Sequence, residues 1–366
     1  MSRGPAPRRR ATLASLAAEL NVSRTTISNA YNRPDQLSTE LRERVLAAAR
    51  DMGYPGPDPV ARSLRTRRAG AVGLMITEPL NYSFNDPAAL GFVTGLAESC
   101  EEAGQGLLLI AVGPSRSVED GTAAVLAAGV DGFVVYSASD DDPYLNVIQQ
   151  RGLPTVVVDQ PMDVPGASRV CIDDRAAMRA MAEHVVGLGH RRIALLTMRL
   201  GRDWPYESTA PAVAKADRLQ SPHFHVQRER IGGVLDAMRA AGLDSDALTV
   251  VESYEHLPSS GGSAVEVALA AQPQVTAIMC TADVLALSAM DHLRAHGIYV
   301  PGQMTVTGFD GVPEALARGL TTVTQSSVEK GRRAGRLLHD PPRSGLPVVD
   351  VLATEVVRGR TSGPPA

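Results

Sequence analysis

Residues 11–32 read ATLASLAAELNVSRTTISNAYN, and this stretch decides the fold of the amino-terminal part of the chain. Its first half predicts a short amphipathic helix over 13–20, because Thr12 is a favoured N-cap residue and apolar residues follow it at spacings of three and four. Asn21 comes next, and asparagine tolerates the left-handed backbone conformation of a tight turn. The first helix is therefore expected to end in such a turn.

The second half predicts another helix over 24–31, with Ser23 placed to cap it. Its inner face would carry Ile27, Ala30 and Tyr31, and its outer face is short, polar and able to form hydrogen bonds. Two short helices joined by a tight turn, the second of them polar outside, are typical of a helix-turn-helix.

The polar face of this second helix is suited to DNA. Serine and threonine hydroxyls fit phosphate oxygens, whereas Arg24, Thr25 and Asn29 share one helix face from which side chains reach base edges. The residues of this segment that we expect to contact DNA are Thr12, Ser23, Arg24, Thr25, Thr26, Ser28, Asn29 and Asn32.

A third helix is expected to close a small core against the first two. Ser38 caps a run of helically spaced apolar residues that reaches Met52, and Gly53 and Pro55 end it. We therefore place a three-helix helix-turn-helix domain at 1–57. The alternative is a three-helix bundle with a polar surface and no affinity for nucleic acid.

The distribution of charge separates this head from the rest of the chain. Residues 1–70 hold 13 Arg, no Lys and 6 acidic residues, a net charge of +7, whereas the remaining 296 residues carry a net charge of −11. Phosphates attract a basic head and repel an acidic body. The alternative is a solvated basic tail.

Composition excludes several classes of protein. The 366 residues suffice for two or three domains, and Cys100, Cys171 and Cys280 are too far apart for a disulfide framework or a zinc cluster. No apolar run is long enough to cross a bilayer, and no apolar segment follows the arginine-rich start as in a signal peptide. We expect a cytoplasmic protein without membrane association.

A proline-rich spacer, PGPDP at 55–59, separates the head from the body. The following run, VARSLRTRR at 60–68, suffices for one or two turns of helix, which would need a docking partner to be stable. We assign 58–69 as a linker with a hinge helix, and 70–366 as the body.

In the body, short apolar runs alternate with helical patterns. The expected parallel strands span 71–76, 107–111, 132–136 and 155–158, followed by 193–197, 249–251, 277–280 and 305–308. The expected helices span 88–103, 117–128, 175–188, 231–241 and 284–296. This is a doubly wound α/β pattern in two sets of strands, hence two lobes that share a cleft at the carboxyl ends of the strands.

Motifs typical of enzymes are missing from the body: it has no nucleophile elbow, no Walker loop and no Gly-rich dinucleotide loop after the first strand. The pairs His223/His225 and His292/His296 have the spacing of metal ligands, but without acidic or cysteine neighbours we interpret them as surface histidines. We interpret the carboxylates of Asp140–Asp142 as groups that favour a helix start or are solvated. We therefore expect no catalytic residue, metal or cofactor.

The stretch at 11–32 resembles the headpiece of the lactose-repressor (LacI/GalR) family of bacterial transcription regulators. GLGHRRIALL at 187–196 and VTGFD at 306–310 are similar to phrases in the body of the same family, and the resemblance extends to about residue 360. It implies a helix-turn-helix headpiece with a hinge helix, followed by a two-lobed, periplasmic-binding-protein-like α/β domain.

By this resemblance, the hinge helix folds when two protomers pair over a pseudo-palindromic operator in double-stranded DNA. Leu64 would be an apolar wedge in the minor groove, and Ala61 would allow close helix contact. Arg62 and Arg65 would contact phosphates or the minor groove. The alternative is a basic interdomain linker without a wedge.

The resemblance also implies a small-molecule effector bound between the lobes. The effector-binding residues that we expect are Tyr82, Phe84, Tyr136, Asp159, Arg230, Asp283 and Gln325. We expect Arg230 to open a helix of the second lobe and to face the cleft together with Asp283 as a charged pair. The alternatives are ordinary structural roles, such as a turn cap for Asp159 or a local ion pair for Arg230.

Two stretches depart from the family pattern. The run Thr281-Ala282-Asp283 has alanine where the family commonly has a polar residue. Residues 198–228 are unusual, which leaves the effector open beyond a sugar-like or related metabolite. The tail at 359–366 reads as disordered and no leucine heptad follows Leu338, so we expect a homodimer.

Together these features predict a sequence-specific DNA-binding repressor whose operator affinity is controlled by an effector, and not an enzyme. The alternatives are a cytoplasmic small-molecule-binding protein without specific DNA recognition and an α/β enzyme acting on a sugar or nucleotide. Deleting residues 1–68 would leave a pure binding protein untouched, and turnover of a ligand would reveal an enzyme.

Overall fold

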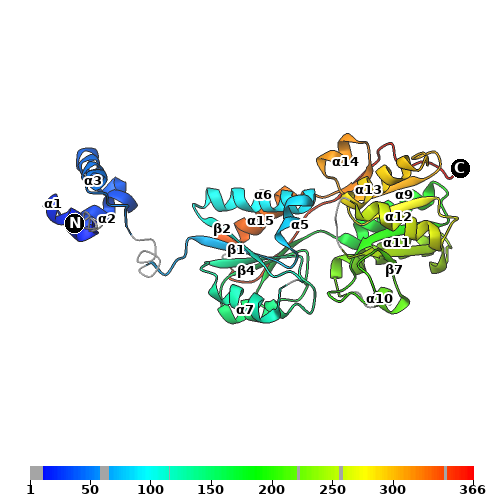
Figure 1. The fold of residues 1–366 in the computed structure, drawn as a ribbon, viewed down its shortest axis with the longest axis horizontal. Coiled ribbons are helices and arrows are strands. Elements are labelled where there is room, and N and C mark those ends of the chain that lie inside the picture. Colours follow the sequence, from blue (N-terminus) through cyan, green and yellow to red (C-terminus); the bar gives the residue numbers. More distant parts are fainter. Residues whose placement is uncertain (1–10, 58–65, 115, 221–222, 255–258, 342–343) are drawn as a thin grey trace, which may run out of the picture. The chain divides into compact units, whose positions relative to one another are not determined.

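The structure is a computed structural model that describes residues 11–57, 66–114, 116–220, 223–254, 259–341 and 344–366 (Figure 1). The chain divides into two compact units, 1–69 and 70–366. Four residues expected in the hinge lie outside the described residues: Ala61, Arg62, Leu64 and Arg65. Among the helices that are described, none is long and apolar enough to span a membrane.

The described part of the first unit is helical. It contains α1 (Leu13–Glu19), α2 (Arg24–Asn32), the 3-10 turn η1 (Pro34–Gln36) and α3 (Thr39–Asp51). Each α-helix begins after the N-cap residue that the sequence predicts. The side chains of Thr12, Ser23 and Ser38 each accept a hydrogen bond from a backbone N–H of the first turn. Asn21 adopts the left-handed conformation, with φ of 52°.

A small apolar core holds these helices together. Leu16, Ile27, Ala30 and Val45 are fully buried, and they come from all three helices. Because each helix is too short to be stable alone in water, this shared burial stabilises the helical structure of the unit.

The second unit contains two parallel-type sheets, each the centre of one lobe. The first sheet has the order β12-β5-β4-β3-β1-β2. Its strands are β1 (Ala71–Ile76), β2 (Gly106–Ala111), β3 (Gly132–Tyr136), β4 (Thr155–Val158), β5 (Ser168–Cys171) and β12 (Val349–Val351). Its helices are α5 (Leu80–Asn85), α6 (Pro87–Glu102), α7 (Val118–Ala127), α8 (Pro143–Arg151) and α15 (Ser327–His339). Figure 1 shows α6 and α15 on one side of this sheet and α7 on the other.

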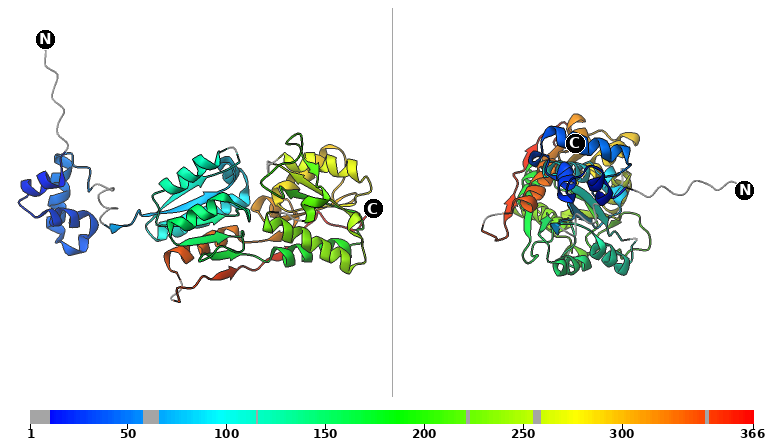
Figure 2. Two further views of the ribbon diagram at one scale, coloured as in Figure 1. Left: turned by 90° about the horizontal axis from the view of Figure 1, so that it is seen from below. Right: turned by 90° about the vertical axis from the view of Figure 1, so that its left-hand side faces the viewer.

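The second sheet has the order β13-β11-β10-β9-β6-β8-β7, in which β7 and β13 run antiparallel to their neighbours. Its strands are β6 (Ile193–Met198), β7 (Ala212–Val213), β8 (Leu248–Ser253), β9 (Ala277–Cys280), β10 (Thr305–Asp310), β11 (Thr321–Thr324) and β13 (Glu355–Val357). Its helices are α9 (Asp174–Gly187), α10 (Ala216–Gln220), α11 (His225–Ala240), η2 (Ser245–Ala247), α12 (Ser260–Ala271), α13 (Asp283–Ala295) and α14 (Pro313–Ala317). Helices cover both faces here as well (Figure 2).

The described chain passes between the lobes after β5, after β11 and after β12, because α15 and β12 belong to the first lobe and β13 to the second. The predicted two-lobed, doubly wound α/β fold is therefore confirmed. Helices α8, α12 and α15 were not predicted from the sequence, because their apolar spacing is interrupted by polar residues or is made up of small residues.

The tail at 359–366 corrects one prediction. It is ordered, with Thr361 only 4% exposed, and its backbone is held by hydrogen bonds that link Val306 N–H to Thr361 O and Arg360 N–H to Gly319 O. His190, buried, also hydrogen-bonds the Gly363 carbonyl at 2.8 Å. A Gly/Pro-rich composition suggested disorder, but satisfied backbone groups and the buried histidine fix the segment.

Candidate functional site

The first unit presents a concave polar surface on α2. Five of the residues expected to contact DNA line it, together with Leu13, Arg33, Gln36 and Thr66; the five are Arg24, Thr25, Ser28, Asn29 and Asn32. Arg24 and Thr25 are exposed, whereas the Asn29 amide donates to Gln36 Oε1 at 3.1 Å. Gln36 was not predicted from the sequence, because it lies on η1, outside the helix-turn-helix pattern.

The other three expected contacts in this segment have local structural roles. Thr12 and Ser23 side chains accept N–H groups at the starts of α1 and α2, and the Thr26 hydroxyl lies 2.8 Å from that of Ser23. These hydroxyls mark the helix N-termini, where backbone N–H groups favour anions such as phosphate.

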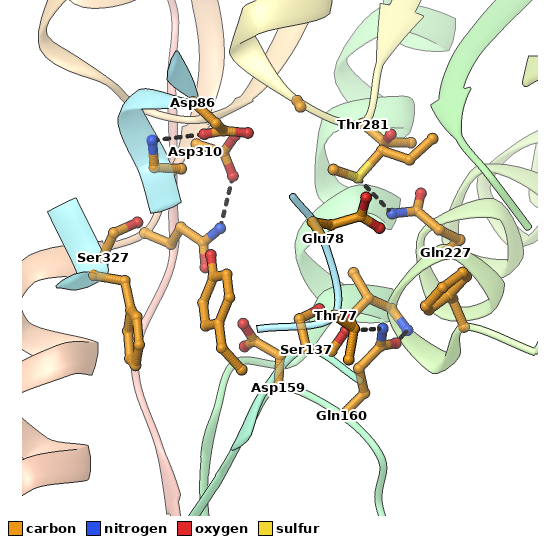
Figure 3. Close-up of a pocket in the computed structure, with 18 of the residues that line it drawn as sticks. Thr77, Glu78, Asp86, Ser137, Asp159, Gln160, Gln227, Thr281, Asp310 and Ser327 are labelled. Carbon is orange, nitrogen blue, oxygen red and sulfur yellow. Dashed lines mark hydrogen bonds between the residues drawn. The ribbon is translucent and has the colours of Figure 1, made fainter. Parts of the chain in front are cut away.

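The second unit contains a pocket lined by both of its lobes. Five of its polar residues stand at the carboxyl ends of strands: Glu78 follows β1, Asp159 and Gln160 follow β4, Arg199 follows β6, and Asp310 ends β10. Figure 3 shows Asp159, Gln160 and Ser137 from the first lobe and Thr281 and Gln227 from the second around this space. The cleft expected at strand ends is therefore present.

Four of the expected effector-binding residues line the pocket: Tyr136, Asp159, Arg230 and Gln325. Phe84 does not line it and its side chain is 55% exposed on α5. Asp283 does not line it either. The side chain of Tyr82 lies outside the described residues.

Arg230 is buried at the pocket wall rather than at a helix start. Helix α11 begins at His225, so the expectation that Arg230 opens it is wrong. Its Nε donates to Asp174 Oδ1 at 2.7 Å, its Nη1 donates to the Thr281 carbonyl at 2.5 Å, and its guanidinium lies 3.6 Å from the centre of the Phe309 ring. The expectation that Arg230 and Asp283 face the cleft together is therefore wrong for Asp283, and Arg230 makes the local ion pair given as the alternative, with Asp174.

The charge of Arg230 is secured by its neighbours. Burial works against the charged form, but the carboxylates of Asp174 and Asp310 outweigh it and hold the pKa of the guanidinium above its usual value. The pocket wall therefore keeps a fixed positive charge.

Asp283 and Asp310 form a buried pair of carboxyl groups at the wall of the pocket. Asp283 accepts the Thr322 hydroxyl at 2.6 Å and the Val312 N–H at 2.8 Å, and burial raises its pKa to about 7. Asp310 accepts the Gln325 amide at 2.7 Å, and burial raises its pKa well above the usual range. Of the two, Asp310 is the one that lines the pocket.

The first-lobe wall combines an ion pair with an aromatic stack. Lys330, which is buried, donates to Asp159 at 2.7 Å and to Gln325 Oε1 at 2.6 Å. Tyr136 stacks on Phe92, with ring centroids 4.5 Å apart. Burial raises the pKa of the Tyr136 phenol, so the pocket offers a neutral hydroxyl beside an apolar ring face.

Direct contacts join the lobes across the pocket. Glu78 of the first lobe is ion-paired with Arg199 of the second, and Gln160 Oε1 accepts the Val226 N–H at 2.7 Å. The relative orientation of the lobes in this structure is therefore fixed partly by groups that also face the pocket.

An acidic rim, Asp140–Asp142, lies at one edge of the cleft and adds three further pairs. Asp140 pairs with Arg228 at 3.1 Å, Asp141 with His223 at 3.1 Å, and Asp142 with Arg202 at 3.5 Å. The sequence suggested that these carboxylates start a helix or face solvent. That expectation covers only part of what they do, because only Asp142 caps α8 and all three pair with side chains of the second lobe.

Several polar residues of the pocket were not predicted from the sequence: Glu78, Asp86, Gln160, Arg199, Asp310 and Lys330. Four of them stand at or just after predicted strands, so the rule that ligands bind at carboxyl ends could have found them. Asp86 and Lys330 carried no such signal, since Asp86 caps α6 and Lys330 lies on the unpredicted α15.

Comparisons with known proteins agree with this architecture. Residues 182–362 match the family described as a periplasmic binding protein-like domain. An HTH-type transcriptional regulator of Mycolicibacterium smegmatis is 78% identical over 366 residues, 100% of both chains. One from Mycobacterium tuberculosis is 73% identical over 362 residues, 99% of both chains.

Solved structures agree as well. A LacI-family transcriptional regulator from Corynebacterium glutamicum is 36% identical with a TM-score of 0.74, covering 96% of this chain and 99% of that one. A complex of the regulator CelR with cellobiose is 29% identical with a TM-score of 0.66, covering 96% and 100%. The lac repressor dimer bound to operator and an anti-inducer, 22% identical over 97% and 100% with a TM-score of 0.76, has the same fold.

Since close relatives match it over its whole length, the chain belongs to the LacI family of helix-turn-helix transcriptional regulators and is a DNA-binding regulator rather than an enzyme.

Proposed function

We propose that this protein is a homodimeric repressor of a pseudo-palindromic operator, and that a polyhydroxylated, sugar-like effector in the cleft pocket controls its affinity for DNA. The observation that carries the proposal is a pocket lined by hydrogen-bonding groups from both lobes. The CelR complex with cellobiose and the lac repressor dimer on its operator support it by similarity.

The lining of the pocket suits a ligand that is rich in hydroxyl groups. Asp159, Asp310 and Gln160 can accept hydrogen bonds from the hydroxyl groups of a ligand. Arg230 and Lys330 can donate hydrogen bonds to its hydroxyl oxygens. The stacked rings of Tyr136 and Phe92 offer an apolar surface to the C–H face of a ring-shaped ligand.

The switch follows from the two-lobed construction. A ligand that touches both lobes favours one lobe orientation by its differential affinity for the two states. The linker and hinge at 58–69 lead directly into β1 of the first lobe, so in a dimer this orientation would set the separation of the two hinges. A coupling of about 1.4 kcal/mol already changes operator affinity tenfold.

The DNA-binding part of the proposal assigns residues 1–57 to the operator half-site and Leu64 to the minor-groove wedge. A protein with this role acts where the chromosome lies, so we place it in the cytoplasm. Leu64→Ala should reduce specific affinity and DNA bending while leaving weak nonspecific binding nearly intact. A circular-permutation gel measures the bending, and unchanged bending would remove the wedge role.

Base reading is tested at Asn29. Asn29→Ala should cost roughly 1–3 kcal/mol of operator affinity and relax the preference at one or two base pairs per half-site. Operator fragments selected from a random DNA pool, with single base substitutions, measure this preference. Equal weakening on all sequences would make Asn29 a phosphate contact instead.

Effector control is tested with the full chain and a panel of sugars, sugar acids and polyols, first by thermal shift and then by operator release in fluorescence anisotropy. Asp159→Asn should raise the effector concentration needed for half response by about tenfold, which is one lost charged hydrogen bond. Asp291→Asn, on the exposed end of α13, is the control and should respond normally. A panel ligand that binds without changing operator affinity would contradict the proposal.

A further inference from the structure

A cluster of Glu266, His292 and His296 lies on the second lobe, and none of the three lines the effector pocket. One ligand atom from each side chain lies within 4.8 Å of the other two. The sequence suggested that these histidines lack an acidic neighbour. That reading is wrong, because the neighbouring helix α12 supplies Glu266.

The two histidines share one face of α13. They are four residues apart, their rings stack with centroids 4.1 Å apart at 28°, and His292 Nδ1 lies 3.8 Å from Glu266 Oε1. Histidines at this helical spacing can chelate one ion, and small rotations of the exposed Glu266 and His296 side chains would bring ligand atoms from these separations to metal-binding distance.

Close packing of α12 against α13 fixes this arrangement. A side chain at Gly261 would collide with the Leu285 carbonyl, so the helices approach to a distance that only glycine permits. At Gly262 an added Cβ would lie 3.1 Å from the Cβ of His292. His292 therefore packs against the backbone of α12 at Gly262, one helical turn before Glu266 on the same face.

The tautomer of His296 is also set. Its Nδ1 lies 2.9 Å from the backbone carbonyl of His292, which can only accept, so this nitrogen carries the proton. The lone pair is then on Nε2, the nitrogen that faces away from the backbone. A hydrogen bond of this kind is what orients histidine ligands in metal sites.

We propose that Glu266, His292 and His296 form a binding site for a divalent transition-metal ion of the zinc class, which joins α12 to α13. Two imidazoles and one carboxylate are a typical three-ligand set for zinc, with water in the fourth position. Calcium and magnesium prefer oxygen ligands, so this donor set selects against them. Because the ion would bind the folded lobe and not the dispersed ligands of the unfolded chain, it would stabilise the second lobe.

Isothermal titration of the metal-free full chain with ZnCl₂ tests the site, with MgCl₂ as the ion control. We expect one tight zinc equivalent per chain, a rise in the melting temperature on zinc addition, and no response to magnesium. Removing a ligand in His296→Ala or Glu266→Gln should weaken zinc binding by about tenfold or more. These side chains are exposed, so the variants should retain the wild-type melting temperature without zinc.

His223→Ala is the matched control, because His223 is an exposed histidine beside a carboxylate, Asp141, at another place on the lobe. It should bind zinc as the wild type does. A copper(II) complex should show two nitrogen ligands by electron paramagnetic resonance in the wild type and one in His296→Ala. No zinc binding by the wild type, unchanged binding by His296→Ala, or a loss confined to His223→Ala would overturn the proposal.

Discussion

At the scale of single residues, the wall of the pocket is built with charged side chains that are buried away from solvent. Arg230 is 6% exposed and Asp174 is 5% exposed, and each contacts the other at 2.7 Å. Such a pair contributes little net stability compared with apolar residues, but removing one partner leaves an uncompensated charge in the interior. Arg230 therefore has a structural role in addition to any contact with the effector.

Arg230→Ala should lower the unfolding free energy of the second lobe by about 3–5 kcal/mol, because Asp174 loses its partner. Urea unfolding followed by the fluorescence of Trp204 measures this loss of stability. Trp204 is the single tryptophan of the chain and lies in the second lobe, as Arg230 does. Combining Arg230→Ala with Asp174→Asn should recover part of the loss. Equal stability of the single and double variants would show that the two charges are not coupled.

Asp283 gives the protein a pH dependence with a definite sign. Burial raises the pKa of its carboxyl to about 7 from a usual value of 3.8, so between these values the folded state holds a proton that the unfolded state has lost. The stabilising contribution of this proton is fully present below the unfolded pKa. It is lost as the pH rises towards the folded pKa.

The contribution of Asp283 to the unfolding free energy should therefore fall from the unfolded pKa of 3.8 upwards and level off above about pH 7. Asp283→Asn should remove this part of the slope, measured by urea unfolding at several pH values. Asp291→Asn is the control: the Arg318 hydrogen bond holds the pKa of Asp291 below its usual value, so its effect lies at lower pH. The same slope in Asp283→Asn and in the wild type would contradict the assignment.

At the scale of elements, the acidic rim between β3 and α8 contributes to the closure of the lobes. Its partners are in the second lobe, two of them at the start of α11 and one in the loop after β6. Partly exposed ion pairs are worth about 0.2–1 kcal/mol each and are weakened by salt. The three ion pairs of the rim therefore add modestly to the stability of the closed lobe arrangement and do not by themselves produce it.

The double variant Asp140→Asn/Asp141→Asn should weaken effector binding by about two- to fivefold, since closure loses roughly 0.5–1 kcal/mol. Titration at low and high salt measures this, and the difference from the wild type should shrink as salt increases. Asp244→Asn/Asp246→Asn, near η2 on the second lobe, is the matched control and should bind normally. A salt-independent difference would point to a local structural change instead.

At the scale of the whole molecule, the two compact units carry separate cores. The cluster around Leu16 and Ile27 belongs to the first unit, whereas the clusters around the two sheets belong to the second. Units with their own cores can fold separately. The basic head and the acidic body can therefore have different ligands.

A fragment of residues 70–366 should bind the effector with the affinity of the full chain and should not bind operator DNA. Calorimetry with the effector and anisotropy with the operator measure the two activities, with the full chain as reference. Loss of effector binding in a fragment that melts as the full chain does would show that the head contributes to the pocket.

The sequence by itself determined the local structure and the class of protein. Capping by Thr12, Ser23 and Ser38 and the left-handed turn at Asn21 depend on groups within four residues, so the pattern of neighbours was sufficient. The alternation of apolar strands and helices likewise predicted two lobes and a pocket at the carboxyl ends of the strands.

Only the tertiary structure decided which polar groups meet. Lys330 reaches Asp159 from α15, Arg230 pairs with Asp174 of α9, and His292 and His296 gain Glu266 from another helix. Each of these pairings is long-range in the chain, and a buried charge takes whichever opposite charge the packing brings within reach. Periodicity specifies the face on which a residue lies, whereas its partner depends on how separate elements pack together.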